Sequence, residues 1–320
     1  MYKAILKRIE SGRRFLVCSH GSPDGDAIAS TLALTLALRE MDKDVVAFNR
    51  DGVPASFSFL PGADTIVTDL EGEKPFDLGF VLDAGELRRA GDDSLPRLCD
   101  SLANIDHHPH SEKFGEFHLV DTEACATGVL IYRLLREAGH PVSFDVATCI
   151  YTAILADTGS FRYSNANPEA FAVAGEMVDK GVDVWNVSSA LYENQEEGRL
   201  RLLAEVLPTL EVSSCGRLAA ICSTLGMMSR TGTGAEQTDG FVNYPRSVSG
   251  VEVAIYFREI EEGKFKVGFR SKGRVDVGSL ARALGGGGHH NAAGAVVEGP
   301  FEQVKKMVFG RVAELLDGQA

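Results

Sequence analysis

Residues 102–108 read LANIDHH, an apolar segment that ends in one carboxylate and two imidazoles. Similar transitions occur at residues 15–26 (FLVCSHGSPDGD), 78–83 (LGFVLD) and 154–157 (ILAD), where acids or a histidine follow an apolar run. In open α/β sheets, ligands bind outside the carboxyl ends of the strands. We therefore expect these polar ends to meet at one edge of a sheet and to form a functional site there.

Strand and helix signals alternate through the first half of the chain. Short apolar runs predict strands at residues 15–19, 45–49, 78–83 and 102–106. Longer segments predict helices at residues 27–41, 127–138, 145–157 and 168–180. This alternation is typical of an α/β domain whose parallel sheet carries helices on both faces. We place this domain at residues 1–185.

The pattern changes after a polar, helix-prone segment at residues 186–211, which we interpret as a connecting helix or linker. Beyond it, residues 251–260 and 265–269 alternate apolar and polar side chains around a Glu-Glu-Gly-Lys turn, which predicts a hairpin. Further elements are predicted at residues 217–223 (strand), 277–284 and 301–316 (helices). Residues 212–320 are therefore expected to form a smaller α/β domain with a mixed sheet.

Composition excludes several classes of function. The chain has 320 residues, 44% of them hydrophobic, and a formal net charge of −13, which disfavours a grip on long duplex DNA but not a small phosphorylated ligand held through metal ions. The N-terminal segment lacks a signal-peptide pattern, and no run approaches the roughly 20 apolar residues of a membrane span. Six scattered cysteines without a C-x-x-C pair predict reduced core residues, so we expect a cytoplasmic protein without membrane contact.

The side chains at the predicted strand ends are the candidates for chemistry: His20, Asp24, Asp26, Asp83, Asp106, His107, His108 and Asp157. Two carboxylates ~4 Å apart repel by roughly 4 kcal/mol at an effective dielectric constant of about 20, so such a cluster needs cations. A pair of divalent ions suggests phosphoester hydrolysis. Carboxylates favour Mn²⁺ or Mg²⁺ and imidazoles favour transition metals, which makes Mn²⁺ the first choice and Zn²⁺ a weaker one.

Simpler roles fit some of these residues taken singly. Asp26 lies at the start of a predicted helix and fits an N-cap, while Asp83 and Asp157 precede small residues and fit turns. An acid at a helix C-terminus opposes the helix dipole, which favours a nearby cation for Asp157. His107 and His108 are adjacent and cannot both point the same way on an extended segment, so we expect one to bind metal and the other to face substrate.

A second candidate site lies in the C-terminal half. Four glycines precede His289 and His290, and a glycine run lets backbone amides approach an anion closely. Arg270 lies in a basic segment (FRSKGR), and a guanidinium can hold a phosphate through two parallel hydrogen bonds. A plain glycine-rich turn and a solvated basic turn are the alternatives.

These motifs resemble the DHH phosphoesterase family over nearly the whole chain. Asp106-His107-His108 is the motif that names the family, and the other acidic motifs follow the family's order. Residues 285–295 (GGGGHHNAAGA) are similar to the glycine-rich signature of the DHH-associated C-terminal domain. Within the family the chain is most similar to the nanoRNases, which are oligoribonucleases that also act as phosphatases on 3′-phosphoadenosine 5′-phosphate.

The resemblance implies a role for each matching residue. One Mn²⁺, or another divalent ion such as Mg²⁺, is bound by His20, Asp24 and Asp83. The second ion is bound by Asp26, Asp83, His107 and Asp157, so that Asp83 bridges the two. His108 lies beside the scissile phosphate and completes the catalytic set with Asp83 and His107. Substrate-binding residues expected in the second domain are Arg270, Ser271, Gly287, Gly288 and His289.

The expected function is hydrolysis of short single-stranded RNA to 5′-mononucleotides, and of a nucleoside bisphosphate, by water activated between two metal ions. This would be an exoribonuclease and 3′-nucleotidase activity. Three alternatives stay open: a phosphodiesterase for cyclic or linear dinucleotides, an inorganic pyrophosphatase, and a nucleotide-binding regulator that does not hydrolyse. The sequence predicts no stable protein partner and leaves a homodimer open.

Overall fold

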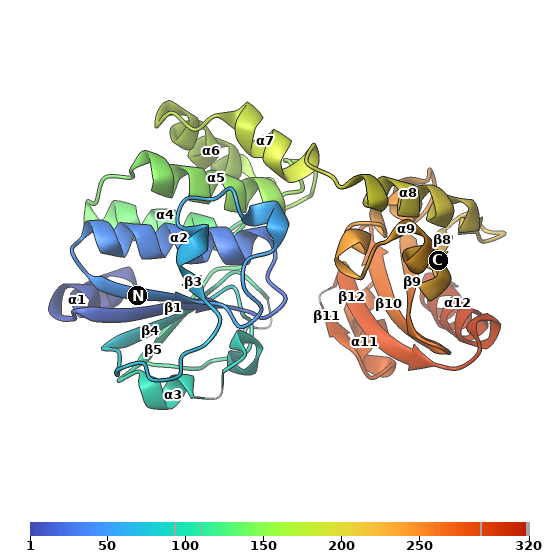
Figure 1. Ribbon diagram of the computed structural model, residues 1–320, viewed down its shortest axis with the longest axis horizontal. Coiled ribbons are helices and arrows are strands. Elements are labelled where there is room, and N and C mark those ends of the chain that lie inside the picture. The colour runs from blue at the N-terminus through green and yellow to red at the C-terminus, as the bar shows by residue number, and fades with distance from the viewer. Residues whose placement is uncertain (93, 110, 289, 318–320) are drawn as a thin grey trace. The chain divides into compact units, whose positions relative to one another are not determined.

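The computed structural model describes residues 1–92, 94–109, 111–288 and 290–317. The chain divides into two compact units, Met1–Asn194 and Gln195–Ala320 (Figure 1). Each unit has its own sheet and its own hydrophobic core.

The first unit is built on a parallel sheet. Its strands are β1 (Arg14–Ser19), β2 (Asp44–Phe48), β3 (Ile66–Val67), β4 (Leu78–Leu82), β5 (Leu102–Asp106) and β6 (Phe117–Val120). They pair in the order β3-β2-β1-β4-β5-β6, and every pairing is parallel. The chain adds strands first on one side of β1 and then on the other, so a topological switch point lies between β1 and β4. The carboxyl ends of β1, β4 and β5 therefore lie side by side.

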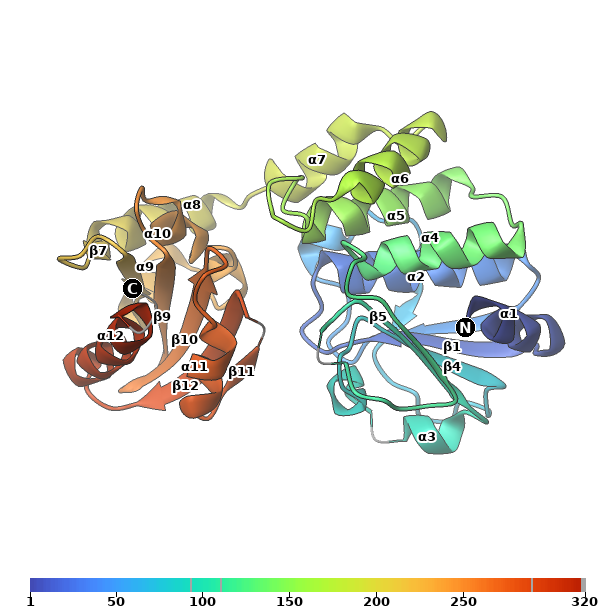
Figure 2. The same ribbon diagram turned by 180° about the vertical axis from the view of Figure 1, so that it is seen from behind.

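Helices cover the two faces of this sheet unequally (Figures 1 and 2). The helical segments are α1 (Tyr2–Ser11), α2 (Gly25–Glu40), η1 (Ala55–Phe57), η2 (Ala63–Thr65), η3 (Leu87–Ala90), α3 (Leu95–Leu98), α4 (Thr127–Ala138), α5 (Phe144–Asp157), α6 (Pro168–Asp179) and α7 (Val184–Tyr192). The long helices α2, α4 and α5 bury one face, whereas α3, η3 and connecting loops cover the other. The expected parallel sheet with helices on both faces is confirmed, although the second face has only short helical segments.

Burial on both faces explains the sequence of the central strands. In β4, Phe80 joins the core beneath the long helices, while its neighbour Val81 joins the core of the opposite face. A strand covered on both sides needs apolar residues at consecutive positions, so it reads as an uninterrupted run rather than as an alternation. The polar residues that follow each run mark where the buried strand ends and the loop region begins.

Two glycines let three helix ends approach one another near the carboxyl edge of the sheet. A Cβ atom on Gly25, in the first turn of α2, would lie 2.5 Å from the Cβ of Ala156 in α5. A Cβ atom on Gly128, in the first turn of α4, would lie 2.5 Å from the Cβ of Ala153. Larger residues would separate these helices, so the glycines set the spacing of the side chains that the helix ends carry.

The second unit contains a mixed sheet. Its strands are β7 (Glu211–Val212), β8 (Leu218–Ser223), β9 (Val253–Glu261), β10 (Lys264–Ser271), β11 (Gly287–Gly288) and β12 (Ala292–Glu298), in the order β11-β12-β10-β9-β8-β7. The β8–β9 pair is parallel and the other pairs are antiparallel. Its helical segments are α8 (Glu197–Val206), η4 (Leu207–Thr209), α9 (Leu225–Thr231), η5 (Glu236–Thr238), α10 (Asn243–Ser247), α11 (Val277–Ala283) and α12 (Phe301–Asp317). The expected mixed-sheet α/β domain is confirmed, and so is the hairpin formed by β9 and β10.

Residues 186–211, interpreted above as one connecting helix or linker, contain the end of α7, a break, α8 and η4. The break at residues 193–196 is fully exposed and buries no apolar side chain, so nothing stabilises a helix there. Pro208 lacks the N–H that α8 would need to continue.

Two further expectations concern cysteines and membranes. The cysteines are free, and five of them are buried as expected, but Cys215 is exposed in the turn between β7 and β8. In the described part of the chain, no helix is long and apolar enough to cross a membrane.

Candidate metal centre

The centre of the candidate site is Asp83, the residue that follows β4. Its N–H donates to the carbonyl of Ile105 in β5 at 3.0 Å, which continues the sheet pairing by one residue. Its φ of 55° lies in the left-handed region, which few residues other than glycine, asparagine and aspartate adopt. The side chain is 2% exposed, and the Thr127 hydroxyl donates to its Oδ1 at 3.1 Å. The strand end therefore holds a carboxylate in one orientation at the switch point.

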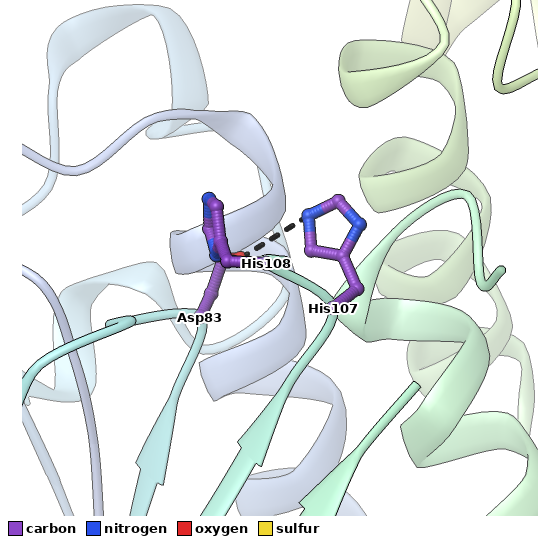
Figure 3. Close-up of side chains that lie close together, drawn as sticks. All are labelled: Asp83, His107 and His108. Atoms are coloured by element: carbon purple, nitrogen blue, oxygen red, sulfur yellow. Dashed lines mark ion pairs between the residues drawn. The ribbon is translucent and has the colours of Figure 1, made fainter. Parts of the chain in front are cut away.

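Three imidazoles surround this carboxylate. His107 Nε2 lies 3.5 Å and His108 Nδ1 3.4 Å from Asp83 Oδ1, and Figure 3 shows both rings turned toward it. His20 Nε2, from the loop after β1, lies 3.7 Å from Asp83 Oδ2. The two oxygens of one carboxylate thus face histidines from different strand ends.

Further acids extend the cluster on both sides of Asp83. Asp24 Oδ2 lies 3.9 Å from His20 Nε2. On the other side, His107 Nε2 lies 3.9 Å from Asp26 Oδ2 and 3.8 Å from Asp157 Oδ2. The structure therefore brings together every residue that the sequence suggested for this edge of the sheet.

The orientation of two histidine rings limits what they offer to these acids. His107 Nδ1 lies 3.1 Å from the carbonyl of Ala124, and His20 Nδ1 lies 2.9 Å from the carbonyl of Gly21. A carbonyl oxygen only accepts, so each Nδ1 carries the proton and a neutral ring presents the lone pair of Nε2. That lone pair faces carboxylate oxygens, which are also acceptors. Such an arrangement needs a proton or a cation between the two groups.

Burial raises the pKa values of several acids in the cluster. Burial raises the pKa of Asp83 well above its usual value, and the charge of Asp26 raises it further. Burial also raises the pKa of Asp26, and it raises that of Asp157 to about 7 although the nearby His107 opposes the shift. The pKa of His107 is raised as well, because the charges of Asp157 and Asp26 outweigh the effect of its own burial. Burial is thus the main reason why the charged forms of the three acids are disfavoured, and for Asp83 repulsion from the neighbouring acids adds to it.

Asp24 and Asp26 have different local roles. Asp24 caps α2, since its Oδ1 accepts from the N–H of Ala27 at 3.1 Å. Asp26 instead accepts from the N–H groups of Thr127 and Gly128, at 2.6 and 3.0 Å, and so satisfies the first turn of α4 from a distant part of the chain. The N-cap role considered for Asp26 at its own helix is wrong. Lone pairs of both carboxylates remain available to a cation.

Asp106 holds His108. Its Oδ1 lies 2.6 Å from His108 Nδ1, and its Oδ2 accepts from the Gly85 N–H at 3.0 Å. Burial opposes the charge of Asp106, but the hydrogen bonds from His108 and neighbouring groups outweigh it and lower the pKa of this carboxyl group. A proton on Nδ1 makes Nε2 the acceptor atom of a neutral His108 ring.

Sequence reasoning missed two residues that position the acids. Asn165 Nδ2 donates to Asp157 Oδ2 at 3.1 Å and to two carbonyl groups. Thr127 binds Asp83 through its hydroxyl and Asp26 through its N–H. The sequence gives no signal for either, because one lies in an irregular loop and the other reads as an ordinary first-turn residue of a helix.

The residues expected to bind substrate in the second unit lie at one end of β10 and in β11. Arg270 Nη1 donates to the carbonyl of Phe269 at 3.0 Å. Ser271 is 4% exposed, and its hydroxyl donates to Asn291 Oδ1 at 2.9 Å. Gly287 and Gly288 are exposed and pair with β12. His289 lies outside the described residues.

Two family models match the chain, one in each unit. The model described as DHH family, N-terminal domain, matches residues 14–154, and the DHHA1 domain matches residues 219–314. The chain is also 34% identical, over 98% of its length, to the bifunctional oligoribonuclease and PAP phosphatase NrnA of Thermus thermophilus, of which the match covers 92%. The chain belongs to the DHH family.

Other relatives match the chain over nearly its full length. The Bacillus subtilis protein with the same name is 30% identical across 93% of each chain. A solved structure, an exopolyphosphatase-related protein from Bacteroides fragilis, superposes with a TM-score of 0.92 at 30% identity and covers 98% of this chain and 95% of that one. The prediction of an enzyme that hydrolyses phosphoric esters is confirmed at this level.

Proposed function

We propose that this chain is a manganese-dependent phosphoesterase that hydrolyses short oligoribonucleotides to 5′-mononucleotides and removes the 3′-phosphate of 3′-phosphoadenosine 5′-phosphate. One observation carries the proposal. The Asp83 carboxylate faces His20 with one oxygen and His107 with the other, each within 3.7 Å, and further acids stand behind both histidines. A carboxylate placed in this way suits a bridge between two cations.

The donor set fits two divalent ions. The first would be held by His20, Asp24 and Asp83, and the second by Asp26, Asp83, His107 and Asp157. Ligand atoms about 2.1 Å from one ion lie roughly 3–3.6 Å apart at usual coordination angles, and the nitrogen–oxygen separations of 3.5–3.9 Å need only small movements to reach this range. Four carboxylates beside two imidazoles, with no thiolate among them, favour Mn²⁺ over Zn²⁺. Bound ions would supply the positive charge that holds a phosphate and acidify a water molecule.

Other residues of the chain position His108 and the metal-binding acids for the proposed reaction. Asp106 fixes the ring of His108, whose Nε2 is the group that we assign to the scissile phosphate or its leaving oxygen. Thr127 and Asn165 hold Asp83 and Asp157 in place, so that the acids need little rearrangement when cations bind. In the second unit, we assign Arg270, Gly287, Gly288 and His289 to substrate binding.

The choice of short RNA and a nucleoside bisphosphate as substrates draws on the relatives named above, which match nearly the whole chain. The acidic surface is consistent with small substrates, because a long polyanion would be repelled by a net charge of −13.

The test is digestion of labelled RNAs of two to five nucleotides with and without Mn²⁺. 3′-Phosphoadenosine 5′-phosphate, a cyclic dinucleotide and pyrophosphate are assayed in parallel. We expect release of mononucleotides from the short RNAs and of AMP from the bisphosphate. Preferred hydrolysis of the cyclic dinucleotide or of pyrophosphate would contradict the proposed substrate class, and nucleotide binding without product would contradict catalysis.

A pair of variants that flank β4 supplies the control. Asp83→Asn removes the central carboxylate at the carboxyl end of β4, whereas Asp77→Asn changes an acid just before its amino end. We expect Asp83→Asn to abolish turnover and Asp77→Asn to keep it. Equal activity of the two proteins would refute the bridging role.

A further inference from the structure

The segment η3, which follows Asp83, contains two adjacent arginines that point to different surroundings. Arg88 is 81% exposed along its side chain and pairs with Glu86. Arg89 is half-buried, and its Nη1 donates to the carbonyl of Ala84 at 3.0 Å, one residue after Asp83. The guanidinium of Arg89 therefore lies at the carboxyl edge of the sheet, beside the acidic cluster.

The turn at Gly85 shows how close Arg89 comes to the site. A Cβ atom on Gly85 would lie 3.5 Å from Arg89 Nη1 and 4.0 Å from Asp106 Oδ2. The carbonyl of Arg89 accepts from the Gly21 N–H at 2.7 Å, which ties η3 to the loop that carries His20. Arg89 is thus anchored between two loops of the candidate metal centre, and the absence of a side chain at Gly85 leaves room beside its guanidinium.

Among the residues that the structure describes, the guanidinium of Arg89 has no anionic partner. Two other half-buried arginines of this unit are paired with acids, Arg14 with Asp44 and Glu73 and Arg133 with Asp121 and Glu169. A third, Arg39, donates instead to the Thr65 hydroxyl and the Val45 carbonyl, away from the candidate site. Across the described ranges, no carboxylate oxygen lies within 4.0 Å of the Arg89 guanidinium, whose hydrogen bond is to the carbonyl of Ala84. A cation withdrawn from water is normally paired with an anion, and an unpaired one in a chain this acidic calls for an explanation.

We infer that Arg89 binds a second phosphate of the substrate, one that is not being cleaved. The inference rests on the proposed function and adds a specificity determinant to it. The hydrogen bond to Ala84 fixes the planar fork, and Nε and Nη2 remain to hold two phosphate oxygens. Arg89 contacts the turn after Asp83 rather than the three imidazoles, so it stands at the flank of the site. A flanking guanidinium selects nucleoside bisphosphates and oligonucleotides over monoesters that carry only the scissile phosphate.

The test compares two substrates that differ by one phosphate, 3′-phosphoadenosine 5′-phosphate and adenosine 3′-monophosphate. Loss of a charged hydrogen-bonding group costs about 10- to 100-fold in binding. We expect Arg89→Ala to lower kcat/KM on the bisphosphate by this factor, mainly through KM, and to change the monophosphate by less than about threefold. Arg89→Lys should recover part of the loss. Arg88→Ala, the adjacent exposed arginine, should leave both substrates unchanged.

A measurement without turnover completes the test. Calorimetric titration of AMP, which retains the 5′-phosphate, should show affinity for Arg89→Ala weakened by a similar factor, while adenosine binding and the rise in Tm caused by Mn²⁺ stay at wild-type values. Equal losses on both substrates, or a smaller Mn²⁺ effect, would show that Arg89 only positions the Asp83 turn. Wild-type affinity for AMP together with a wild-type KM would also overturn the inference. A wild-type protein that binds AMP but hydrolyses nothing would refute the proposed function, and the AMP titration would still decide the role of Arg89.

Discussion

Asp83→Asn should make the metal-free protein more stable, and it should reduce the stabilisation that Mn²⁺ gives. Asparagine matches the shape of aspartate and tolerates the left-handed backbone at this position, so the substitution changes charge with little added strain. Burial and the neighbouring acids raise the pKa of Asp83, which means that its charged form opposes folding. Removing the charge in chelator should therefore raise the free energy of unfolding.

The size and pH dependence of this effect follow from the structure. Repulsion between acids ~4 Å apart is roughly 4 kcal/mol at an effective dielectric constant of about 20, and partial neutralisation reduces the gain to about 1–3 kcal/mol. Because the folded-state pKa is raised, the penalty is present above that pKa and disappears as the pH falls below the unfolded value of about 3.9. The variant should exceed wild type in stability at pH 8 and match it near pH 4.

Mn²⁺ should stabilise the wild-type protein much more than the variant. An ion at 100 times its Kd adds about 2.7 kcal/mol, which for a unit of this size raises Tm by about 5–11 °C. Asp83→Asn removes a ligand shared by both ions and should reduce this rise to below about 2 °C.

Differential scanning calorimetry in chelator and in Mn²⁺, with Asp77→Asn as control, measures both effects. Asp77 accepts N–H bonds from Arg14 and Arg13, which lower its pKa, so Asp77→Asn should lose stability at pH 8 and keep the full Mn²⁺ response. A full Mn²⁺ response in Asp83→Asn, or lower stability than wild type in chelator, would refute the reasoning.

Three further changes test how the site is held. Gly128→Ala should lower the free energy of unfolding by about 1–3 kcal/mol and weaken the Mn²⁺ response, because the added Cβ would lie 2.5 Å from Ala153. The control is Gly175→Ala, at an open position within α6, which should stabilise the protein by about 0.5–1 kcal/mol. Denaturant titration measures both changes. Asp106→Asn should lower kcat by about 10²- to 10⁴-fold with little change in KM, since an amide cannot accept both from His108 and from the Gly85 N–H; a near-normal kcat would remove His108 from the mechanism. Asn165→Ala should weaken Mn²⁺ affinity about 10- to 100-fold by freeing Asp157, measured by calorimetric titration, whereas an unchanged affinity would leave Asn165 a purely structural role.

Much of the fold is visible in the sequence because the central strands are buried on both faces. The strand predicted at residues 102–106 has the bounds of β5, and the helix predicted at residues 127–138 has those of α4. The prediction fails where small residues form strands. Ala292–Glu298 reads as part of a glycine-rich loop, yet it forms β12, because Gly294 lies opposite Gly268 of β10 and the two backbones pair closely there. Composition alone does not reveal such a strand, since its partner supplies the stabilisation.

In the candidate site, too, some residues could be predicted from the sequence and others could not. The residues that end strands were identifiable because a carboxylate after an apolar run has few structural uses. What holds them was not, because the partners lie far away in sequence: Asp26 accepts from N–H groups 101 and 102 residues further along the chain, and Thr127 reaches Asp83 across 44 residues.

The acids of the site differ in how the surrounding structure stabilises their charge. A helix N-terminus stabilises a nearby carboxylate through its unpaired N–H groups and its dipole, and α4 provides this for Asp26. Asp83 accepts a hydrogen bond from the Thr127 hydroxyl rather than from a helix N-terminus, and it sits among the other acids. Hydrogen bonds therefore compensate the charge of Asp26 better than that of Asp83. Asp83 is also the carboxylate that His20 faces on one side and His107 on the other. A cation gains most by binding where the protein has left charge unbalanced, and this is the physical reason why we propose Asp83 as the point around which two ions would assemble.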